Sequence, residues 1–338
     1  MSKKGVKKIG YLGAGVWGYC LASLLASKGY HVVSWSIEEE RVRYLEEMRE
    51  HPKMKGFPAP PTLSFTTDMA LALKGQDLVV EGVTSAGIRQ VFQKVKQIHI
   101  PECPIVLTSK GIEQNTGLLL TDVVTEVLGI EHRNKIGVLS GPSLAIEVLK
   151  GLPSSVVCSG FDPLVMALIH ETFSTTTFRV YPNSDVNGVE LGGALKNIIA
   201  IACGVSDGLG FGDNTKAALM TRGLHEIRKL AVTKGCKPET LNGLAGMGDL
   251  CVTCLSKFSR NYQFGRLIAE GMDPGKAKKK IGMVVEGTYT CLSAIQLAKR
   301  ANIELPITES VYKILFEHLS PHDAVKMLLQ RITKEEYL

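Results

Sequence analysis

The stretch "IGYLGAGVWG", residues 9–18, decides the fold of the first half of the chain. It places Gly13, Gly15 and Gly18 in the spacing G-x-G-x-x-G, after a strand-like segment and before a helix-like one. In such a loop the first glycine permits a tight turn, the second lets the backbone approach a pyrophosphate, and the third allows close packing of helix on strand. Because a second strand-like segment, "HVVSW", follows, the pattern predicts a dinucleotide held at the N-terminus of that helix.

The end of the second expected strand leaves the choice between NAD and NADP open. An NAD site usually has an acidic residue there for the ribose hydroxyls, whereas this strand ends in "WSI", residues 35–37. The acidic residues 38–40 come slightly late and suit the cap of the next helix equally well. Arg41 and Arg43 reach a 2′-phosphate only if that turn folds back.

Strand-like and helix-like segments alternate along the first half, which is typical of a parallel sheet with crossover helices. The expected strands are Lys7–Leu12, His31–Trp35, Thr62–Thr67, Asp77–Val83, Pro104–Lys110, Lys135–Gly141, Ser154–Gly160 and Phe178–Tyr181. Helical stretches such as Cys20–Lys28 and Leu118–Leu128 lie between most of them, each followed by a glycine.

The strand signals fade after Tyr181–Asp185, and long helical segments start near Val189 and continue to the C-terminus. The expected fold class is therefore α/β. A Rossmann-like, doubly wound dinucleotide-binding domain is expected over residues 1–186, and a mostly α-helical substrate and catalytic domain over 187–338. With 338 residues, of which 45% are hydrophobic, the chain is large enough for two cores.

Charge alone does not choose between small anions and nucleic acid as ligands, and a cytoplasmic protein is expected. The net charge of +6 is scattered, and the densest basic run, Asp273–Lys280, begins like a capped helix. No interleaved aromatic residues accompany it, so no nucleic-acid partner is expected. The N-terminus lacks the pattern of a secretory signal, and Lys196 and Asn197 interrupt the longest apolar stretch, so no membrane segment is expected.

The eight cysteines are expected to be buried thiols and not a disulfide framework. Cys251 and Cys254 form a "CVTC" pair, but no second pair of Cys or His residues stands at ligand spacing. Structural zinc needs four ligands, so no metal site is expected.

The stretch "ELGGALKNIIAIACGVSDG" sets one full charge, Lys196, in an apolar helix. At helical spacing its neighbours are glycine, alanine, isoleucine and cysteine, so it joins no solvated face. Two interpretations remain open on this stretch alone. Lys196 either snorkels to water from a packed stem, or is desolvated with a pKa near neutrality, which suits proton transfer.

Five segments taken together resemble the NAD(P)-dependent glycerol-3-phosphate dehydrogenases. They are "GAGVWG" (13–18), "TSKGIE" (108–113), "LSGPSLAIEV" (139–148), "GGALKNIIAIACGVSDGLGFGDNTKAAL" (192–219) and "GMGDLCVTCLSKFSRNYQFG" (246–265). The "SGPS" and "SRN" versions resemble the bacterial branch. The resemblance implies reversible reduction of dihydroxyacetone phosphate to sn-glycerol 3-phosphate by NADH or NADPH, for phospholipid synthesis. The sequence departs from the family pattern at two places near the expected cofactor site. One is Ile37, where an arginine is common, and the other is "GVTS" (82–85), where "VPS" is common.

The resemblance implies catalytic roles for Lys196, Lys110 and Asp249. Lys196 matches the family's general acid for reduction, which is the base in the reverse direction. Lys110 matches a lysine that contacts substrate and cofactor, and its charge would lower the pKa of Lys196. Asp249 would hold the Lys196 ammonium. Without the resemblance, Lys110 is a solvated strand end and Asp249 a helix N-cap.

The resemblance also implies binding roles. The expected substrate contacts are Lys110, Gly141, Ser143, Lys196, Asn197, Asp249, Thr253, Ser259, Arg260 and Asn261. The expected cofactor contacts are Gly13, Gly15, Val16, Trp17, Gly18, Lys110, Ala145, Arg260, Val284 and Glu286. Arg260 suits the phosphate because its planar fork gives paired hydrogen bonds. Without the resemblance, Asn197 is a buried amide, "SRN" a surface loop, and "SGPSLA" an ordinary start of a helix.

Other functions stay open at this point. A hydroxyacid dehydrogenase of similar build, a cofactor-sensing protein without turnover and a nucleic-acid binder are the alternatives. The "SRN" segment and the long "ALKN…GDNTKAAL" stretch argue against the first. The joint presence of Lys196, Lys110 and Arg260 argues against the second. A homodimer is usual in the family that the chain resembles.

Overall fold

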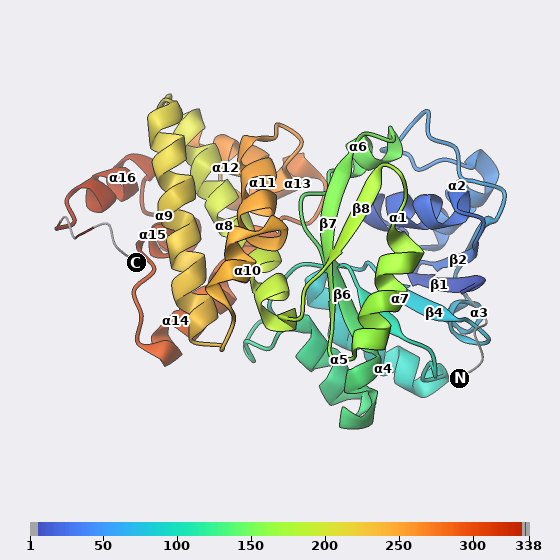
Figure 1. The fold of residues 1–338 in the computed structure, drawn as a ribbon. Helices are drawn as coiled ribbons and strands as arrows, with labels where there is room; N and C mark the ends of the chain where they lie inside the picture. Colours follow the sequence, from blue (N-terminus) through green and yellow to red (C-terminus); the bar gives the residue numbers. More distant parts are fainter. Residues whose placement is uncertain (1–5, 333–334, 336–338) are drawn as a thin grey trace. The chain divides into compact units, whose positions relative to one another are not determined.

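Apolar runs of three to seven residues build one eight-stranded sheet in the first part of the computed structural model, which describes residues 6–332 and residue 335 (Figure 1). The strands are β1 (Lys8–Leu12), β2 (His31–Trp35), β3 (Leu63–Thr66), β4 (Leu78–Glu81), β5 (Ile105–Leu107), β6 (Ile136–Ser140), β7 (Ser154–Gly160) and β8 (Phe178–Pro182). Their order in the sheet is β3-β2-β1-β4-β5-β6-β7-β8. All neighbours pair in parallel except β6 and β7, which are antiparallel.

This strand order places a topological switch point between β1 and β4. The chain moves outward from β1 to β2 and β3, and then returns to β4 on the other side of β1. In open α/β sheets, ligands bind outside the carboxyl ends of the strands at such a point. The glycine loop follows β1 and therefore lies at that edge.

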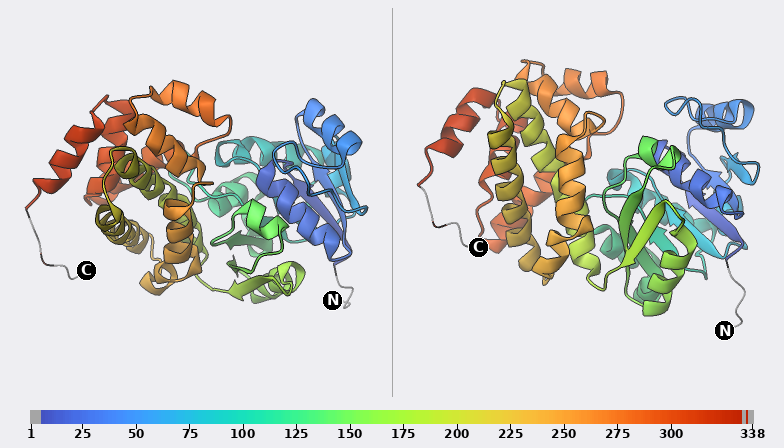
Figure 2. Two further views of the ribbon diagram at one scale, coloured as in Figure 1. Left: turned by 90° about the horizontal axis from the view of Figure 1, so that it is seen from above. Right: turned by 45° about the horizontal axis from the view of Figure 1, so that its top comes forward.

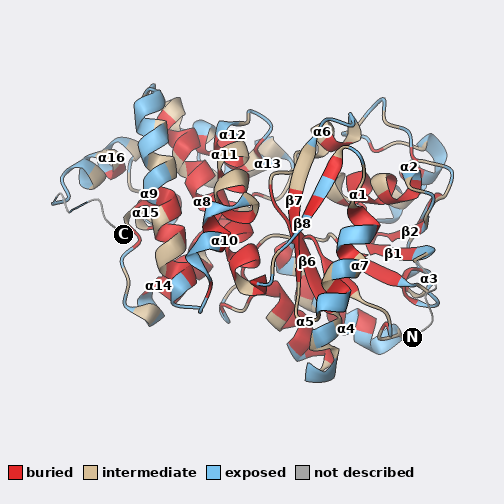
Figure 3. Cartoon of the chain, viewed as in Figure 1, coloured by how far each residue is buried: buried red, intermediate tan, exposed pale blue. Residues whose placement is uncertain are grey.

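Helices cover both faces of the sheet (Figures 1 and 2). They are α1 (Val16–Ser27), α2 (Glu39–Met48), α3 (Met69–Leu73), α4 (Ile88–Ile98), α5 (Leu120–Leu128), α6 (Ala145–Leu149) and α7 (Pro163–Phe173). Buried residues of α1, α6 and α7 share one cluster with alternate residues of the strands. The inner strands β1, β4, β5 and β6 are buried on both faces over nearly all of their residues, which explains their nearly continuous apolar sequences. The edge strands β3 and β8 have exposed residues, as β8 shows in Figure 3. The predicted fold class is confirmed.

Helices make up the second part. They are α8 (Val186–Gly208), α9 (Asp213–Val232), α10 (Pro238–Asn242), α11 (Asp249–Leu255), α12 (Arg260–Ala269), α13 (Pro274–Ile281), α14 (Glu286–Ala301), α15 (Pro306–Phe316) and α16 (Pro321–Leu329). The basic run forms α13, and Asp273 caps it by accepting hydrogen bonds from the N–H groups of Gly275 and Lys276. The proposed solvated helix with an aspartate cap is thus observed.

α8 is the central helix of this part and is buried along most of its length (Figure 3). By length and composition it is apolar enough to cross a membrane, but 94% of its most apolar window is buried inside the protein. Two glycines let α12 lie directly against it. A Cβ on Gly204 would meet the carbonyl oxygen of Tyr262 at 2.1 Å, and a Cβ on Gly265 would meet that of Ile201 at 2.1 Å.

The chain folds as two compact units. The first ends at Ser109 and resumes as Leu120–Val186, and the second consists of Lys110–Leu119 and the chain from Asn187 onward. The sequence-based division at 186/187 puts residues 110–119 in the first domain, whereas they group with the second unit. The physical reason is burial, because Ile112 and Leu119 belong to the helical core.

Candidate functional site

Asp249 lies between two lysines in the second unit. The Lys196 ammonium, from the middle of α8, donates to Oδ1 of Asp249 and to Oγ1 of Thr253, the latter at 2.8 Å. The Lys110 ammonium donates to Oδ2 of Asp249 at 2.7 Å. The Thr253 hydroxyl in turn donates to the backbone carbonyl of Asp249 at 2.6 Å. Each carboxylate oxygen of Asp249 is therefore used by a different lysine.

Local structure explains why Asp249 is available for this pairing. It is the first residue of α11 and directly follows a π-helical turn, Leu244–Gly248. The N-cap of α11 is Gly248, so the N-cap interpretation of Asp249 in "GMGDL" is wrong. Thr253 lies one turn later on the same face of α11, beside Asp249. Such π-helical turns are frequent at functional sites.

Burial determines the state of Lys196. Its exposed fraction is 6%, and that of Asp249 is 1%. Burial lowers the pKa of Lys196, Asp249 raises it and the nearby Lys110 charge lowers it, and together these effects place it at about 7. The ammonium is bonded inside the protein, so the geometry favours the desolvated lysine over the snorkelling one.

Two amides lie next to this cluster along the chain. The Asn261 side chain donates from Nδ2 to Oδ1 of Asn197 at 2.9 Å, and its Oδ1 accepts from the N–H of Gly287 at 2.9 Å. Both asparagines are buried. Without the resemblance, Asn197 was expected to be a buried amide bonded to backbone; it is buried, but its amide oxygen accepts from a side chain. The two amides also hold the starts of α12 and α14 beside α8.

Arg260 is the first residue of α12. Ser259 precedes it as N-cap, and its hydroxyl accepts from the N–H of Tyr262 at 3.3 Å. The Arg260 guanidinium donates from Nη1 to the carbonyl of Val284 at 2.9 Å. Burial lowers the pKa of Arg260, and the charge of Glu286 raises it. Arg260 thus contacts Val284, lies near Glu286 and belongs to α12, not to a solvated surface loop.

The glycine loop of the first unit has the geometry that its spacing predicts. Gly13 has φ +120°, and a Cβ there would lie 2.6 Å from the carbonyl oxygen of Gly82. A Cβ on Gly18 would lie 2.2 Å from the carbonyl oxygen of Gly13. A Cβ on Gly15, the N-cap of α1, would meet no atom within 4 Å. The backbone is open at Gly15, and the donors of the first turn, at Val16 and Trp17, follow it, which suits a pyrophosphate.

The end of β2 keeps both cofactors possible. Ile37 is 65% exposed, and Trp35 donates from Nε1 to the carbonyl of Thr67. Glu38 and Arg41 form an ion pair at 2.8 Å on the exposed first turn of α2. An acidic and a basic side chain, Glu38 and Arg41, therefore both follow β2, where the residue that recognises the ribose is usual in such domains.

The "SGPSLA" segment turns sharply after β6. Gly141 has φ +131°, which favours glycine, and the Ser143 hydroxyl donates back to its carbonyl at 2.9 Å. Ala145 begins α6, and its carbonyl accepts from Sγ of Cys20 in α1 at 3.5 Å. These three residues lie in the first unit with the glycine loop.

Two family models match the chain. NAD-dependent glycerol-3-phosphate dehydrogenase N-terminus matches residues 8–163, and NAD-dependent glycerol-3-phosphate dehydrogenase C-terminus matches residues 185–326. The chain belongs to this family. The enzyme class, an NAD(P)-dependent oxidoreductase, and the family resemblance are confirmed.

Similar members of the glycerol-3-phosphate dehydrogenase family align over nearly the whole chain. The glycerol-3-phosphate dehydrogenase [NAD(P)+] of Protochlamydia amoebophila is 60% identical over 333 residues, which are 98% of this chain and 100% of that protein. That of Chlamydia caviae is 58% identical over 332 residues, 98% of this chain and 99% of that protein. The crystal structure of the Coxiella burnetii glycerol-3-phosphate dehydrogenase has a TM-score of 0.92 at 39% identity, covering 96% and 99% of the two chains.

Sequence reasoning missed two buried carboxyl groups in this dehydrogenase. Glu81, at the end of β4, accepts from the N–H of Val83 and the hydroxyl of Ser109. Glu226, in α9, accepts from the N–H groups of Ile307 and Thr308 at the start of α15. The available signal was an acidic residue inside an apolar segment, "DLVVEGV" for Glu81 and "LHEIRKLAV" for Glu226.

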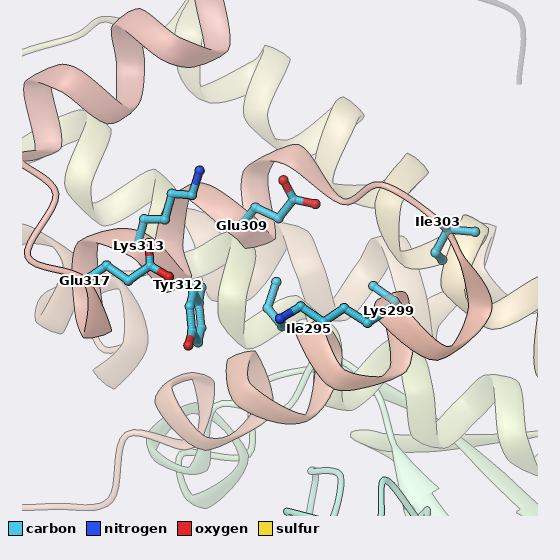
Figure 4. A pocket seen from close by; sticks show the side chains of 8 residues that line it. Ile295, Lys299, Ile303, Glu309, Tyr312, Lys313 and Glu317 are labelled. Atoms are coloured by element: carbon cyan, nitrogen blue, oxygen red, sulfur yellow. The ribbon is translucent and has the colours of Figure 1, made fainter.

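The cysteines and a hollow in the helical unit lie outside the lysine and aspartate cluster. The eight cysteines are free, and six of them are buried. Among the described residues, no group of three His, Cys, Asp or Glu side chains could hold a metal ion. A hollow of about 200 Å³ between α14 and α15 contains none of the expected site residues (Figure 4). It is lined by Ile295, Ala298, Lys299, Ile303, Glu309, Tyr312, Lys313 and Glu317.

Proposed function

We propose that this chain reduces dihydroxyacetone phosphate to sn-glycerol 3-phosphate with NADH or NADPH, reversibly, with Lys196 as the proton donor. The observation that carries the proposal is the pairing of buried Asp249 with buried Lys196 and with partly buried Lys110. Family membership supports the reaction, because the similar proteins are named for it. The nicotinamide supplies the hydride when the dinucleotide is bound.

The residues of the cluster have complementary tasks. Reduction of a ketone needs a proton at the carbonyl oxygen, and a general acid works best with a pKa near the working pH. A pKa of about 7 meets that condition for Lys196. Asp249 and Thr253 hold its ammonium in one place, and Lys110 adds a second positive charge that favours the developing alkoxide. In the reverse direction, neutral Lys196 takes the proton.

The start of α12 suits the phosphate of the substrate. Arg260 offers a planar fork of donors, and the N-terminus of a helix favours a negative group. Asn261 and Asn197 would contact the phosphate and the hydroxyls, and the other proposed contacts are Lys110, Gly141, Ser143, Ser259 and Thr253. The buried, mutually bonded amides support a preorganised site.

The first unit suits the dinucleotide. Its pyrophosphate would lie at the glycine loop, on Gly13, Gly15 and the first turn of α1. Lys110, Ala145, Arg260, Val284 and Glu286 complete the proposed contacts. Division of labour between a dinucleotide-binding domain, residues 1–186, and a helical substrate domain, residues 187–338, belongs to the same proposal.

We also propose that the enzyme is a cytoplasmic homodimer that supplies glycerol 3-phosphate for phospholipid synthesis. The family resemblance supports these points, and the helical unit is the proposed source of the dimer interface. The molar mass in solution, measured by light scattering, tests the dimer. A mass equal to a single chain at micromolar concentration would contradict it.

The first experiment follows the loss of nicotinamide absorbance when the purified protein meets dihydroxyacetone phosphate, with NADH and NADPH in parallel. Turnover with either cofactor is expected. The ratio of kcat/KM with NADH to kcat/KM with NADPH reports how the end of β2 recognises the ribose. Lys196→Ala is expected to bind the dinucleotide as before and to lose nearly all turnover. Near-normal turnover of this variant would overturn the role of Lys196. If the folded wild type binds cofactor but does not turn over dihydroxyacetone phosphate, the result would favour a hydroxyacid dehydrogenase as the function.

A further inference from the structure

Glu81 is a fully buried carboxyl group at the carboxyl edge of the sheet. It ends β4, with an exposed fraction of 0%, and is paired in register with Leu12 of β1 and Leu107 of β5. It therefore lies at the switch point, beside the strand that leads into the glycine loop. A carboxyl group is rarely buried without a specific reason, because burial disfavours its charge.

One oxygen of Glu81 joins two segments. Oε1 accepts from the N–H of Val83 at 2.6 Å and lies 2.7 Å from Oγ of Ser109. Oε2 is buried and has no hydrogen-bond partner among the residues that the structure describes. The bonded oxygen thus connects the loop after β4 to the loop after β5, which leads directly into Lys110.

The hydroxyl of Ser109 completes the bridge. It donates to Oε1 of Glu81 at 2.7 Å and also lies within hydrogen-bond distance of the carbonyl oxygen of Val83. One hydroxyl proton can be shared between two such acceptors in a three-centre bond. Burial raises the pKa of Glu81 and the hydrogen bonds that it accepts lower it, so that this pKa lies at about 7.

The peptide between Gly82 and Val83 transmits the position of Glu81 to the glycine loop. Its N–H is held by Glu81, and its carbonyl oxygen is the atom that a Cβ on Gly13 would meet at 2.6 Å. The N–H of Gly82 donates to the carbonyl of Leu12 at 2.9 Å. The loop after β1 thus packs directly on a peptide whose orientation Glu81 holds.

We propose that Glu81 is a positioning residue for the dinucleotide site, whose carboxyl group holds the 82–83 peptide and thereby the conformation of the glycine loop. It touches no substrate and no reacting atom. The inference rests on the proposed placement of the dinucleotide at that loop. It deepens that proposal by assigning a task to the "GVTS" segment, where the chain departs from the family pattern.

A purely structural role makes a different prediction. Loss of a buried hydrogen-bonded group lowers stability wherever it occurs, without a specific effect on ligand affinity. Glu226 is a matched control, because it is a buried carboxyl group, 5% exposed, that accepts hydrogen bonds from backbone N–H groups in the second unit. The comparison of Glu81→Ala with Glu226→Ala therefore separates positioning from stability.

The test is a fluorescence titration of each purified variant with NADH and NADPH, with the KM for dinucleotide, the KM for dihydroxyacetone phosphate and kcat measured alongside. Glu81→Ala is expected to raise the Kd and the KM for dinucleotide about tenfold, with a smaller change in kcat, since a buried N–H loses its acceptor. Glu226→Ala is expected to lower the melting temperature and to leave the Kd within about twofold.

Two milder variants keep the test decisive if Glu81→Ala does not fold. Glu81→Gln retains an oxygen for the N–H of Val83, so its Kd is expected to lie between those of Glu81→Ala and the wild type. Ser109→Ala removes the hydroxyl at the other end of the bridge and is expected to raise the Kd in the same direction. Values within about twofold of wild type for both would overturn the inference.

A further variant distinguishes failure of the inference from failure of the proposed function. Gly13→Ala would push a Cβ into the Gly82 carbonyl and is expected to weaken dinucleotide binding. If Gly13→Ala weakens binding and Glu81→Ala does not, Glu81 has no positioning role and the dinucleotide site stands. If Gly13→Ala binds normally, the placement of the dinucleotide is wrong and the inference falls with it. Equal weakening by Glu81→Ala and Glu226→Ala would also overturn it.

Discussion

Opposing effects of burial and of two neighbouring charges set the pKa of Lys196. Burial and the Lys110 charge disfavour its ammonium, whereas Asp249 stabilises it. The resulting pKa of about 7 places the change of charge at neutral pH, where a lysine in water would remain fully protonated. A small change in either neighbour should therefore be visible in the pH dependence of the reaction.

The direction of the reaction sets the sign of the pH dependence. For reduction, kcat/KM is expected to fall as the pH rises through about 7, because only protonated Lys196 can donate. For oxidation of glycerol 3-phosphate, kcat/KM is expected to rise over the same interval, because the base must be neutral. Initial rates in both directions between pH 5.5 and about 9 measure this. Parallel profiles in the two directions would contradict the assigned role.

The two partners of Lys196 should shift this profile in opposite directions. Asp249→Asn removes the charge that raises the pKa of Lys196, so the break should move to lower pH. Lys110→Met removes a charge that lowers this pKa, so the break should move to higher pH. Both variants lose rate, and the diagnostic quantity is the pH of the break in kcat/KM for reduction. Shifts of the same sign would show that the pKa of Lys196 does not control the rate.

The contact of α8 with α12 depends on backbone approach. Glycine at positions 204 and 265 leaves no side chain between the two helices, and this closeness holds Asn197 beside Asn261.

The expected strands also show the limits of local patterns at this scale. All eight are present, but β5 ends at Leu107 and not at Lys110. β7 runs antiparallel to β6, although a helix-forming segment lies between them, because α6 has only five residues.

Gly204→Ala tests the contact between α8 and α12. The added methyl group would meet the Tyr262 carbonyl at 2.1 Å, so the helices must separate. A loss of about 1–3 kcal/mol in the free energy of unfolding is expected from such overpacking. Denaturant unfolding followed by circular dichroism measures it. Gly212→Ala is the control, since a Cβ there meets no atom within 4 Å. Equal stability of the two variants would contradict the close contact.

The molecule divides its proposed ligands between two cores. The glycine loop belongs to the unit built on the sheet, and Lys196, Asp249, Lys110 and Arg260 belong to the helical unit. The chain passes between the units after Ser109, Leu119 and Val186. One of these passages separates Ser109, bonded to Glu81, from Lys110, bonded to Asp249.

Amide hydrogen exchange tests this division on the intact enzyme. NADH alone is expected to slow exchange at residues 13–18 and 82–83, because the pyrophosphate binds there. Added glycerol 3-phosphate is expected to slow exchange at the start of α12, and phosphate-free glycerol is the control. Slowing by NADH that is confined to residues after 186 would contradict the assignment of the dinucleotide to the first unit.

The sequence by itself determined the alternation of strands and helices, the glycine loop, the change to helices, expected near Val189 and observed from Val186, and the family. These features depend on local spacing, in which residues one turn or one pleat apart share a face. The contacts that span the chain were decided by the tertiary structure, and of these only the pairing of Asp249 with Lys196 was expected, from the family resemblance. Asp249 pairs with Lys196 across 53 positions and with Lys110 across 139, and Glu81 meets Ser109 across 28. Each of these pairings lies within one unit and follows from the packing inside that unit, which local spacing along the sequence does not determine.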